Sequence, residues 1–277
     1  MENHDLQYIL SKRYDNGSDF WATPDNKVAV GGVFSTIGTL TALSDLGINS
    51  DHEAIVGGTE ILLGLIRPDG RIKISPKGSI FPCHIAVAAV ALCKNGYANN
   101  EKVKLMLDYL LNSQHTDGGW RCKKFLYGRG PETEYSNPGV TLMVLDTFRY
   151  AGLNNTIEKL DQAVESLLRH WEVKTPIGPC HFGIGSQFMK VEYPFLRYNL
   201  FYYVYVLSFY RKAVKDKRYV EVLKELEKKI DHNGMILVER TNPKLSTLEF
   251  CKKGKPSLRA TVRYNEILTN LITYKDA

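Results

Sequence analysis

Residues 112–122, NSQHTDGGWRC, connect two segments of different character. The segment before them, NEKVKLMLDYLLNSQ (100–114), has apolar residues at helical spacing among charged ones, whereas the segment from Asn137, NPGVTLMVLDTFRYAGL, is apolar nearly all round. In the connection, Asp117 is followed by two glycines. This pattern is typical of a turn, because Asp accepts local backbone N–H bonds and Gly adopts positive φ. The stretch therefore predicts a turn between an amphipathic helix and a buried one.

Apolar segments like the second recur along the chain at nearly regular spacing, and four of them have proline as their second residue. Proline is favoured in the first helical turn, where its missing N–H would have had no intrahelical partner. The spacing therefore predicts a repeat of helices. The segments are FPCHIAVAAVALCKNGY from Phe81, NPGVTLMVLDTFRYAGL from Asn137, YPFLRYNLFYYVYVLSFY from Tyr193, KPSLRATVRYNEILTNLI from Lys255, and VFSTIGTLTALSDLG (33–47), which lacks the proline.

A second set of helices, more charged and amphipathic, is predicted between the apolar ones, at about 3–12, 51–64, 100–114, 155–171 and 217–230. An amphipathic helix buries one face, whereas a helix that is apolar nearly all round is buried on all sides. Gly47, Gly96 and Gly152 follow apolar segments and suit C-terminal caps. Five such pairs predict an all-α fold in which an outer ring of helices surrounds an inner ring, within one domain over residues 1–277.

The composition fits a large buried core, since 44% of the 277 residues are apolar and 11% are aromatic. The net charge of +6 is spread over the chain with local clusters such as KKGK (252–255), which favours a local anion site over a nucleic-acid surface. We therefore expect no nucleic-acid partner.

The apolar runs 84–93 and 199–210 are shorter than the ~20 residues of a membrane-spanning helix. The N-terminus lacks the pattern of a secretory signal. Five cysteines, an odd number at scattered spacings, fit free thiols or metal ligands better than a disulfide framework. We expect a cytoplasmic protein without stable membrane insertion.

Gln114, Asp117, the two glycines and Trp120 resemble the glutamine–tryptophan repeat motif of the terpenoid cyclase and protein prenyltransferase superfamily. RPDGRI (67–72) and DHNGMI (231–236) are weaker echoes of it. The resemblance implies an α/α-toroid of about five helical hairpins, as a small branch of that superfamily. It also implies a central funnel, lined with aromatic residues, that holds an isoprenoid.

In the superfamily the N-termini of the inner helices crowd one mouth of the barrel, and such N-termini attract anions such as diphosphate. For Arg197 and Arg259 the alternative is a solvated or ion-paired arginine in the first helical turn. For Trp120 and the tyrosines the alternative is packing within the core. The substrate-binding residues that the resemblance implies are Trp120, Phe182, Phe188, Lys190, Tyr193, Arg197, Tyr198, Asn199 and Arg259.

The chain also departs from the superfamily. It has no Asp-x-Asp-Asp run, so cyclisation initiated by protonation is not expected, and it has no Asp-x-Cys pair at the inner-helix starts. Cysteine and histidine occur there instead. A zinc site would need three or four of them to converge; the alternative is that they are buried or hydrogen-bonded structural residues. We expect zinc ligands at Cys83, Cys122, Cys180 and His181, and catalytic groups at His84, His181 and Asp117.

Three functions follow from these features. The first is an enzyme of the prenyltransferase type, which binds an isoprenoid or its diphosphate and transfers the prenyl group. The second is a non-catalytic toroid that carries a lipid or binds a protein partner. The third is a carbohydrate-active α/α-barrel, which needs two carboxylates beside a glycosidic bond; its candidates are Asp117, Glu132, Glu134 and Glu192.

Overall fold

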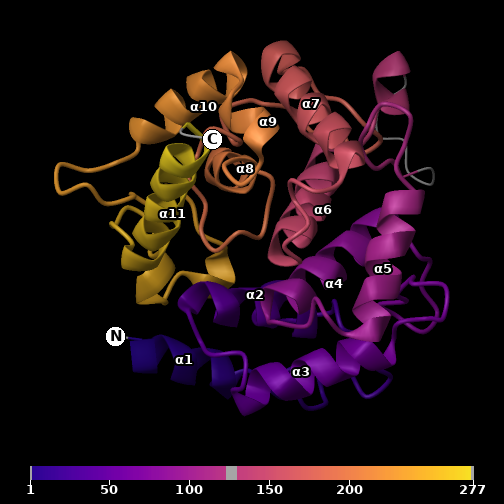
Figure 1. Ribbon diagram of the computed structural model, residues 1–277. Helices are drawn as coiled ribbons and strands as arrows, with labels where there is room; N and C mark the ends of the chain where they lie inside the picture. The colour runs from indigo at the N-terminus through magenta and orange to yellow at the C-terminus, as the bar shows by residue number, and fades with distance from the viewer. Residues whose placement is uncertain (1, 123–129, 276–277) are drawn as a thin grey trace.

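The structure is a computed structural model that describes residues 2–122 and 130–275. Within these ranges the chain has eleven α-helices and no β-strand, only isolated bridges (Figure 1), so the all-α prediction is confirmed. The α-helices are α1 (Glu2–Ser11), α2 (Thr36–Leu46), α3 (Glu53–Gly64), α4 (Pro82–Lys94), α5 (Glu101–Asn112), α6 (Pro138–Tyr150), α7 (Glu158–Val173), α8 (Leu200–Leu207), α9 (Arg211–Val214), α10 (Lys217–Glu227) and α11 (Leu258–Lys275). Short 3-10 helices are η1 (Gly32–Phe34), η2 (Pro131–Glu134), η3 (Pro243–Leu245) and η4 (Glu249–Cys251).

The helices fall into two sets, as the two kinds of periodicity predict. Helices α2, α4, α6, α8 and α11 pack against one another in chain order, while α3, α5, α7 and α10 lie outside them (Figure 1). Every residue of α8 is buried, whereas α5 buries only Val103, Met106, Leu107 and Leu110. The difference follows from composition, because a helix that is apolar all round gains stability only when all its faces leave water.

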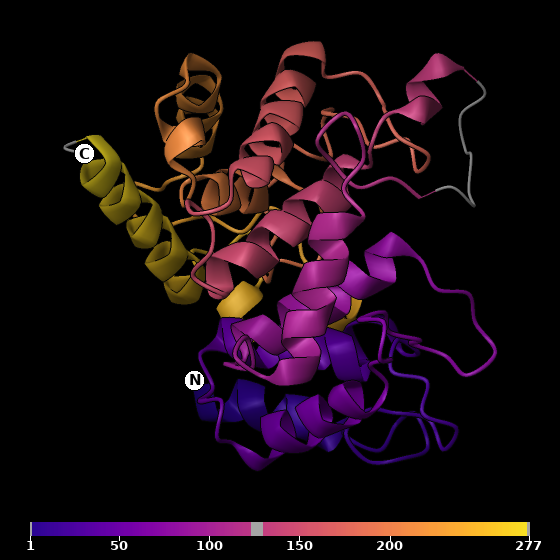
Figure 2. The ribbon, with the colours of Figure 1, turned by 45° about the vertical axis from the view of Figure 1, so that its right-hand side comes forward.

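The first two helices contact the segment in which the last helix begins. Asp5 of α1 is buried, and its carboxylate accepts hydrogen bonds from the backbone N–H groups of Glu249 (3.0 Å) and Phe250 (2.9 Å) in η4. Farther on, Arg259 of α11 packs against Gly47 at the end of α2, where an added Cβ would lie 2.5 Å from its guanidinium. In both views α11 begins near α1 and extends away from it (Figures 1 and 2).

Two of the four prolines open helices as predicted, and two do not. Pro82 and Pro138 occupy the first turns of α4 and α6. Pro194 follows a cis peptide bond in a loop, and α8 begins only at Leu200. The prediction was wrong there because Asn199 is the residue that caps α8: its side chain accepts bonds from two backbone N–H groups of the first turn.

Pro256 also stands outside its helix. Ser257 follows it, and the Ser257 hydroxyl accepts a hydrogen bond from the Ala260 N–H at 3.1 Å, so α11 begins at Leu258. A serine with this hydrogen bond satisfies one of the N–H groups that a helix start leaves unpaired. The capping side chain, rather than the proline, therefore sets both helix starts.

Four connections contain the same five-residue turn. In residues 115–119 the His115 N–H donates to the Gly119 carbonyl (2.8 Å), and the Gly118 N–H donates to the His115 carbonyl (2.9 Å). The same two bonds occur in 67–71, 231–235 and 23–27. The fourth residue of each turn has positive φ, and the copy at 23–27 was missed because Asn26 stands where the others have glycine.

The glutamine–tryptophan stretch joins three helices. The Trp120 indole N–H donates to the Leu110 carbonyl at the end of α5 (2.8 Å), and the Trp120 carbonyl accepts from the Asn137 N–H at the start of α6 (2.9 Å). The Gln114 amide donates to the carbonyls of Gly118 (2.6 Å) and Lys159 (2.8 Å), the latter in the first turn of α7. These side chains therefore fix one outer helix to the next.

The glycine of the turn packs against the backbone of the following outer helix. An added Cβ at Gly118 would lie 2.5 Å from the Gln162 carbonyl oxygen of α7, and one at Gly70 would lie 2.1 Å from the Leu105 carbonyl oxygen of α5. The two contacted residues occupy the same position in their helices. This shared contact supports the helical repeat that the sequence predicts.

Buried apolar side chains form one cluster that extends from Ile9 in α1 to Ile267 in α11. Across the described ranges, no helix combines the length and the apolar character needed to cross a membrane.

We predict that Gly118→Ala destabilises the protein more than Gly234→Ala. Both glycines have positive φ, so each alanine costs about 1–2 kcal/mol of left-handed strain. Nothing lies within 4 Å of an added Cβ at Gly234, whereas Gly118 meets a backbone carbonyl, which adds about 1–3 kcal/mol. Urea unfolding of the two variants measures the difference. Equal losses would show that the turn does not pack on α7 as described.

Candidate functional site

A cavity of about 380 Å³ lies among the inner helices. The first halves of α2 and α6 and the middle of α4 form three of its walls, and α8 with the preceding loops forms the rest. This central cavity is mostly apolar and aromatic, and Arg197 is the charged side chain among those that line it. The lining residues are Ile37, Gly38, Thr41, Val87, Val90, Gly139, Met143, Phe182, Phe195, Leu196, Arg197, Tyr198 and Tyr202.

The late start of α8 creates this cavity. Because the helix begins at Leu200, the residues from Phe195 to Tyr198 form a loop wall where the sequence predicted a first helical turn. Glycine on the opposite helix makes room for the loop, since an added Cβ at Gly139 would lie 3.1 Å from the Phe182 ring. The connection 174–199 therefore takes a different conformation from the four turns described above.

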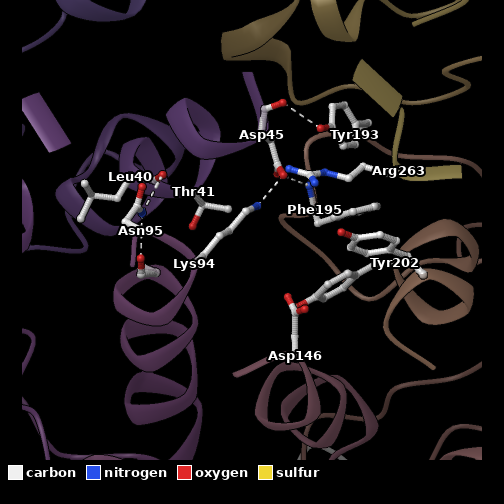
Figure 3. Close-up of polar contacts among 12 residues, drawn as sticks. Leu40, Thr41, Asp45, Lys94, Asn95, Asp146, Tyr193, Phe195, Tyr202 and Arg263 are labelled. Carbon is white, nitrogen blue, oxygen red and sulfur yellow. Dashed lines mark hydrogen bonds and ion pairs between the residues drawn. The ribbon is translucent and has the colours of Figure 1, made fainter. Parts of the chain in front are cut away.

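Asp45 holds this loop (Figure 3). Its side chain is buried and forms an ion pair with the equally buried Lys94 of α4. The second carboxylate oxygen accepts the Phe195 N–H (3.1 Å), and the Asp45 carbonyl accepts the Tyr193 hydroxyl (2.8 Å). The positive charge of Arg263 on α11 also interacts with this carboxylate. One buried aspartate therefore connects two inner helices, the loop and the last helix.

A second buried pair supports the far wall of the cavity. The Tyr202 hydroxyl donates to Asp146 (2.7 Å), which also accepts from Arg149 Nε (2.6 Å). The Arg149 guanidinium lies 3.7 Å from the Tyr150 ring centroid and 4.3 Å from that of Phe209. Both buried ion pairs, Asp45 with Lys94 and Asp146 with Arg149, have a signal in the sequence: each is a charged residue within a helix that is apolar nearly all round. A charge in such a helix needs a partner, because the helix is buried on all sides.

Arg197 lies at the exposed edge of the central cavity, with 44% of its side chain accessible to solvent. Its Nε is 3.6 Å from one oxygen of Glu192, and Arg240 Nε is 3.3 Å from the other. Glu192 is 2% exposed, and neither oxygen has a hydrogen-bond donor among the described residues. Burial raises the pKa of Glu192, and the two guanidinium groups offset part of that rise.

A second, outer cavity of about 500 Å³ lies between α7, η2 and the turn at 115–119. It contains two of the four carboxylates considered for carbohydrate chemistry, Asp117 and Glu132. Glu134 instead pairs with Arg121 (2.8 Å), and Glu192 lies beside the central cavity. The residues that line the outer cavity are Asp117, Pro131, Glu132, Tyr135, Ser136, Pro138, Glu165, Ser166, Arg169, His170, Val173, Thr175 and Ile177.

His170 of α7 is 1% exposed and links the two cavities. Its Nε2 lies 3.2 Å from the Thr175 carbonyl, which only accepts, so Nε2 carries the proton. Its Nδ1 therefore accepts from the Tyr198 hydroxyl at 2.9 Å. Burial lowers the pKa of His170 to about 4. No local pattern singles out this histidine, because it stands on an amphipathic outer helix.

The predicted substrate-binding residues separate into three groups. Phe182, Arg197 and Tyr198 line the central cavity. Trp120, Phe188, Tyr193 and Asn199 are buried and support the walls. Lys190 is exposed, and Arg259 packs beside Gly47 at the C-terminal end of α2; neither is among the described residues that line the central or the outer cavity.

Cys83, Cys122 and Cys180 are free thiols that lie near one another. Burial raises the pKa of Cys83 to about 11, with smaller contributions from the thiols of Cys122 and Cys180. A thiol with a raised pKa is protonated at neutral pH and is a poor nucleophile. In the ranges that the structure covers, no group of three or more His, Cys, Asp or Glu side chains is arranged to hold a metal ion. Zinc binding therefore stays a prediction.

The two predicted catalytic histidines differ in their surroundings. His84 Nδ1 is buried and has no hydrogen-bond partner among the described atoms, its ring meets the Phe81 ring edge-on at 4.8 Å, and burial lowers its pKa. His181 Nε2 lies 3.3 Å from a carboxylate oxygen of Glu132. The two histidines therefore contact different groups.

Asp117 is engaged by the neighbouring loop. Its oxygens accept bonds from the Ser136 hydroxyl (2.5 Å), the Ser136 N–H (2.6 Å) and the Gly119 N–H (3.2 Å). Burial acts to raise the pKa of Asp117, but these hydrogen bonds lower it on balance. An ionised carboxylate with three donors is suited to fixing the turn to the start of α6.

No family model matches the sequence, and no curated protein matches it.

We predict that His170 makes the stability of the protein fall with acid. Its pKa is about 4 in the folded state against 6.5 as the ordinary value, so the unfolded state binds more protons between these limits. The stabilisation is complete above pH 6.5 and falls by about 1.4 kcal/mol per pH unit towards pH 4.

Urea unfolding of the wild type and of His170→Gln, measured from pH 7 to about pH 4.5, isolates this contribution as the difference between the two slopes. Identical slopes would contradict the account of a buried, neutral His170.

Proposed function

We propose that this protein binds an isoprenoid, or an isoprenoid diphosphate, in its central cavity. The observation that carries the proposal is an apolar, aromatic cavity of about 380 Å³ whose described lining residues include one cationic side chain, Arg197, at the exposed edge. Its volume lies within the range of about 300–1,000 Å³ that is usual for small-molecule sites.

The walls suit the two ends of such a ligand differently. Aliphatic side chains from α2, α4 and α6 would cover the hydrocarbon chain, gaining about 25 cal/mol for each Å² of apolar surface removed from water. The rings of Tyr198 and Tyr202 would attract a developing allylic cation. The planar guanidinium of Arg197 would donate to diphosphate oxygens in a charge-assisted pair.

We further propose that the five helix pairs form an α/α-toroid of the terpenoid cyclase and prenyltransferase kind. The shared turn, the joint around Trp120 and the successive contacts of the inner helices support this arrangement. The contacts of Asp5 with η4 and of Arg259 with Gly47 support a ring that closes within the chain.

Prenyl transfer is the reaction that this cavity favours. The bond between the allylic carbon and the diphosphate oxygen breaks, diphosphate leaves with the electron pair, and a nucleophile of the acceptor bonds to the carbon and loses its proton. A non-catalytic carrier is the second candidate. It is favoured by the engagement of the Asp117 carboxylate with Ser136 and by the raised pKa of the Cys83 thiol. Mass spectrometry of prenyl diphosphate recovered after incubation separates turnover from retention.

We predict that Arg197→Gln weakens the binding of a prenyl diphosphate by about tenfold or more, because a hydrogen bond to a charged group contributes about 1.5–3 kcal/mol. Binding of the corresponding prenyl alcohol, which lacks the anionic group, stays unchanged. Isothermal titration calorimetry with the fifteen-carbon pair of ligands measures both affinities.

Arg240→Gln is the matched control, because Arg240 also pairs with Glu192 but does not line the cavity. We expect it to leave both affinities unchanged. If folded wild-type protein binds neither ligand, or if both arginine variants lose affinity equally, the proposed site is wrong.

A further inference from the structure

The central and outer cavities lie on opposite sides of one thin wall. Three pairs of adjoining residues build it, and each pair has one member on either side. The outer members are Pro138, Ile177 and His170, and the central members are Gly139, Phe182 and Tyr198. Ile177 and Phe182 are joined by two backbone hydrogen bonds of 3.0 Å each, so this part of the wall is fixed by the main chain.

Tyr198 is the part of the wall that side chains alone hold in place. Its hydroxyl donates to His170 Nδ1, and its ring stacks on the His170 ring with centroids 5.9 Å apart. The Phe182 ring meets it edge-on at 5.7 Å, and the Phe188 ring lies at 4.9 Å. These contacts leave the ring closely held between the two cavities.

We propose that Tyr198 sets the length of the apolar chain that the central cavity accepts, by closing this cavity off from the outer one. The inference rests on the proposed binding of an isoprenoid. A ligand whose anionic group contacts Arg197 has its chain confined to about 380 Å³, whereas about 500 Å³ lies beyond the wall. Without the Tyr198 ring the two cavities join, so one ligand reaches both, which together have more than twice the volume of the central cavity.

The outer cavity has the chemistry to take the additional chain. Next to the wall its lining is apolar, with Pro138, Val173 and Ile177. Its three carboxylates contact other groups: Asp117 accepts from Ser136, Glu132 lies 3.3 Å from His181 Nε2, and Glu165 accepts from both ends of the Arg218 guanidinium at 2.8 and 3.0 Å. A longer hydrocarbon therefore meets apolar surface on passing the position of Tyr198.

The test compares prenyl diphosphates of ten, fifteen and twenty carbons on the purified protein by calorimetry. We expect Tyr198→Ala to raise the affinity for the twenty-carbon ligand relative to the ten-carbon ligand by about tenfold or more, since each added group in an apolar pocket changes binding at least that much. Tyr198→Phe keeps the ring, loses the bond to His170 and retains the wild-type ratio.

Tyr203→Leu is the control that tests whether an effect of Tyr198→Ala comes from joining the two cavities or only from looser packing around Tyr198. Tyr203 packs against Tyr198 with ring centroids 6.2 Å apart but lines neither cavity. It therefore changes the packing without joining the cavities, and we expect the wild-type ratio. If Tyr198→Ala does not fold, Tyr198→Leu takes its place.

The outcomes distinguish this inference from the function on which it rests. Binding by the wild type with no change of ratio in Tyr198→Ala overturns the role of Tyr198 and leaves the proposed function standing. If the wild type binds no prenyl diphosphate, the proposed function fails. The affinity for a long ligand relative to a short one is then measured with saturated fatty alcohols, in the wild type and in Tyr198→Ala. A shift with those alcohols supports the wall, whereas no shift or no binding overturns it as well.

Discussion

The buried ion pair between Asp45 and Lys94 is the contact on which the arrangement of the central cavity depends. Removing one partner of such a pair is costly, by about 3–5 kcal/mol, because the other charge is left in a medium of low dielectric. The ends of α2 and α4 are therefore held together. The same aspartate accepts bonds from Tyr193 and Phe195, so the loop that walls the cavity is fixed to the helices opposite it (Figure 3).

One connection between an outer and an inner helix differs from the other four. Four connections between outer and inner helices contain one five-residue turn whose fourth residue has positive φ. The connection 174–199 does not repeat that turn, and it contributes Phe182, Arg197 and Tyr198 to the cavity. Loops on a rigid scaffold commonly carry function, because they vary without changing the packing beneath them.

Much of this fold was accessible from the sequence, since helical periodicity depends on neighbours a few residues apart. The two sets of helices, the turn at 115–119 and the aromatic content of 178–202 are of this local kind. The cap of α8 at Asn199 is also local, although the proline pattern favoured an earlier start. The path of the preceding loop was not accessible, because it depends on Asp45, which is distant in sequence. His170 became a site candidate only when the fold placed it against Tyr198. Glu192 was a candidate for carbohydrate chemistry from the sequence, but its pairing with Arg197 and Arg240 appears only in the fold. Convergence of side chains from different repeats leaves no local pattern.

The central claim is that Asp45 holds the loop wall of the cavity, and hydrogen exchange at the Phe195 amide tests it most directly. The variant Asp45→Leu/Lys94→Met replaces the ion pair by apolar side chains of similar size, an exchange that is often neutral for stability. It removes the acceptor of the Phe195 N–H. The account predicts a folded variant in which this amide exchanges about tenfold faster or more, as the loss of one charge-assisted hydrogen bond requires. An unchanged exchange rate at Phe195 in the folded variant would contradict it.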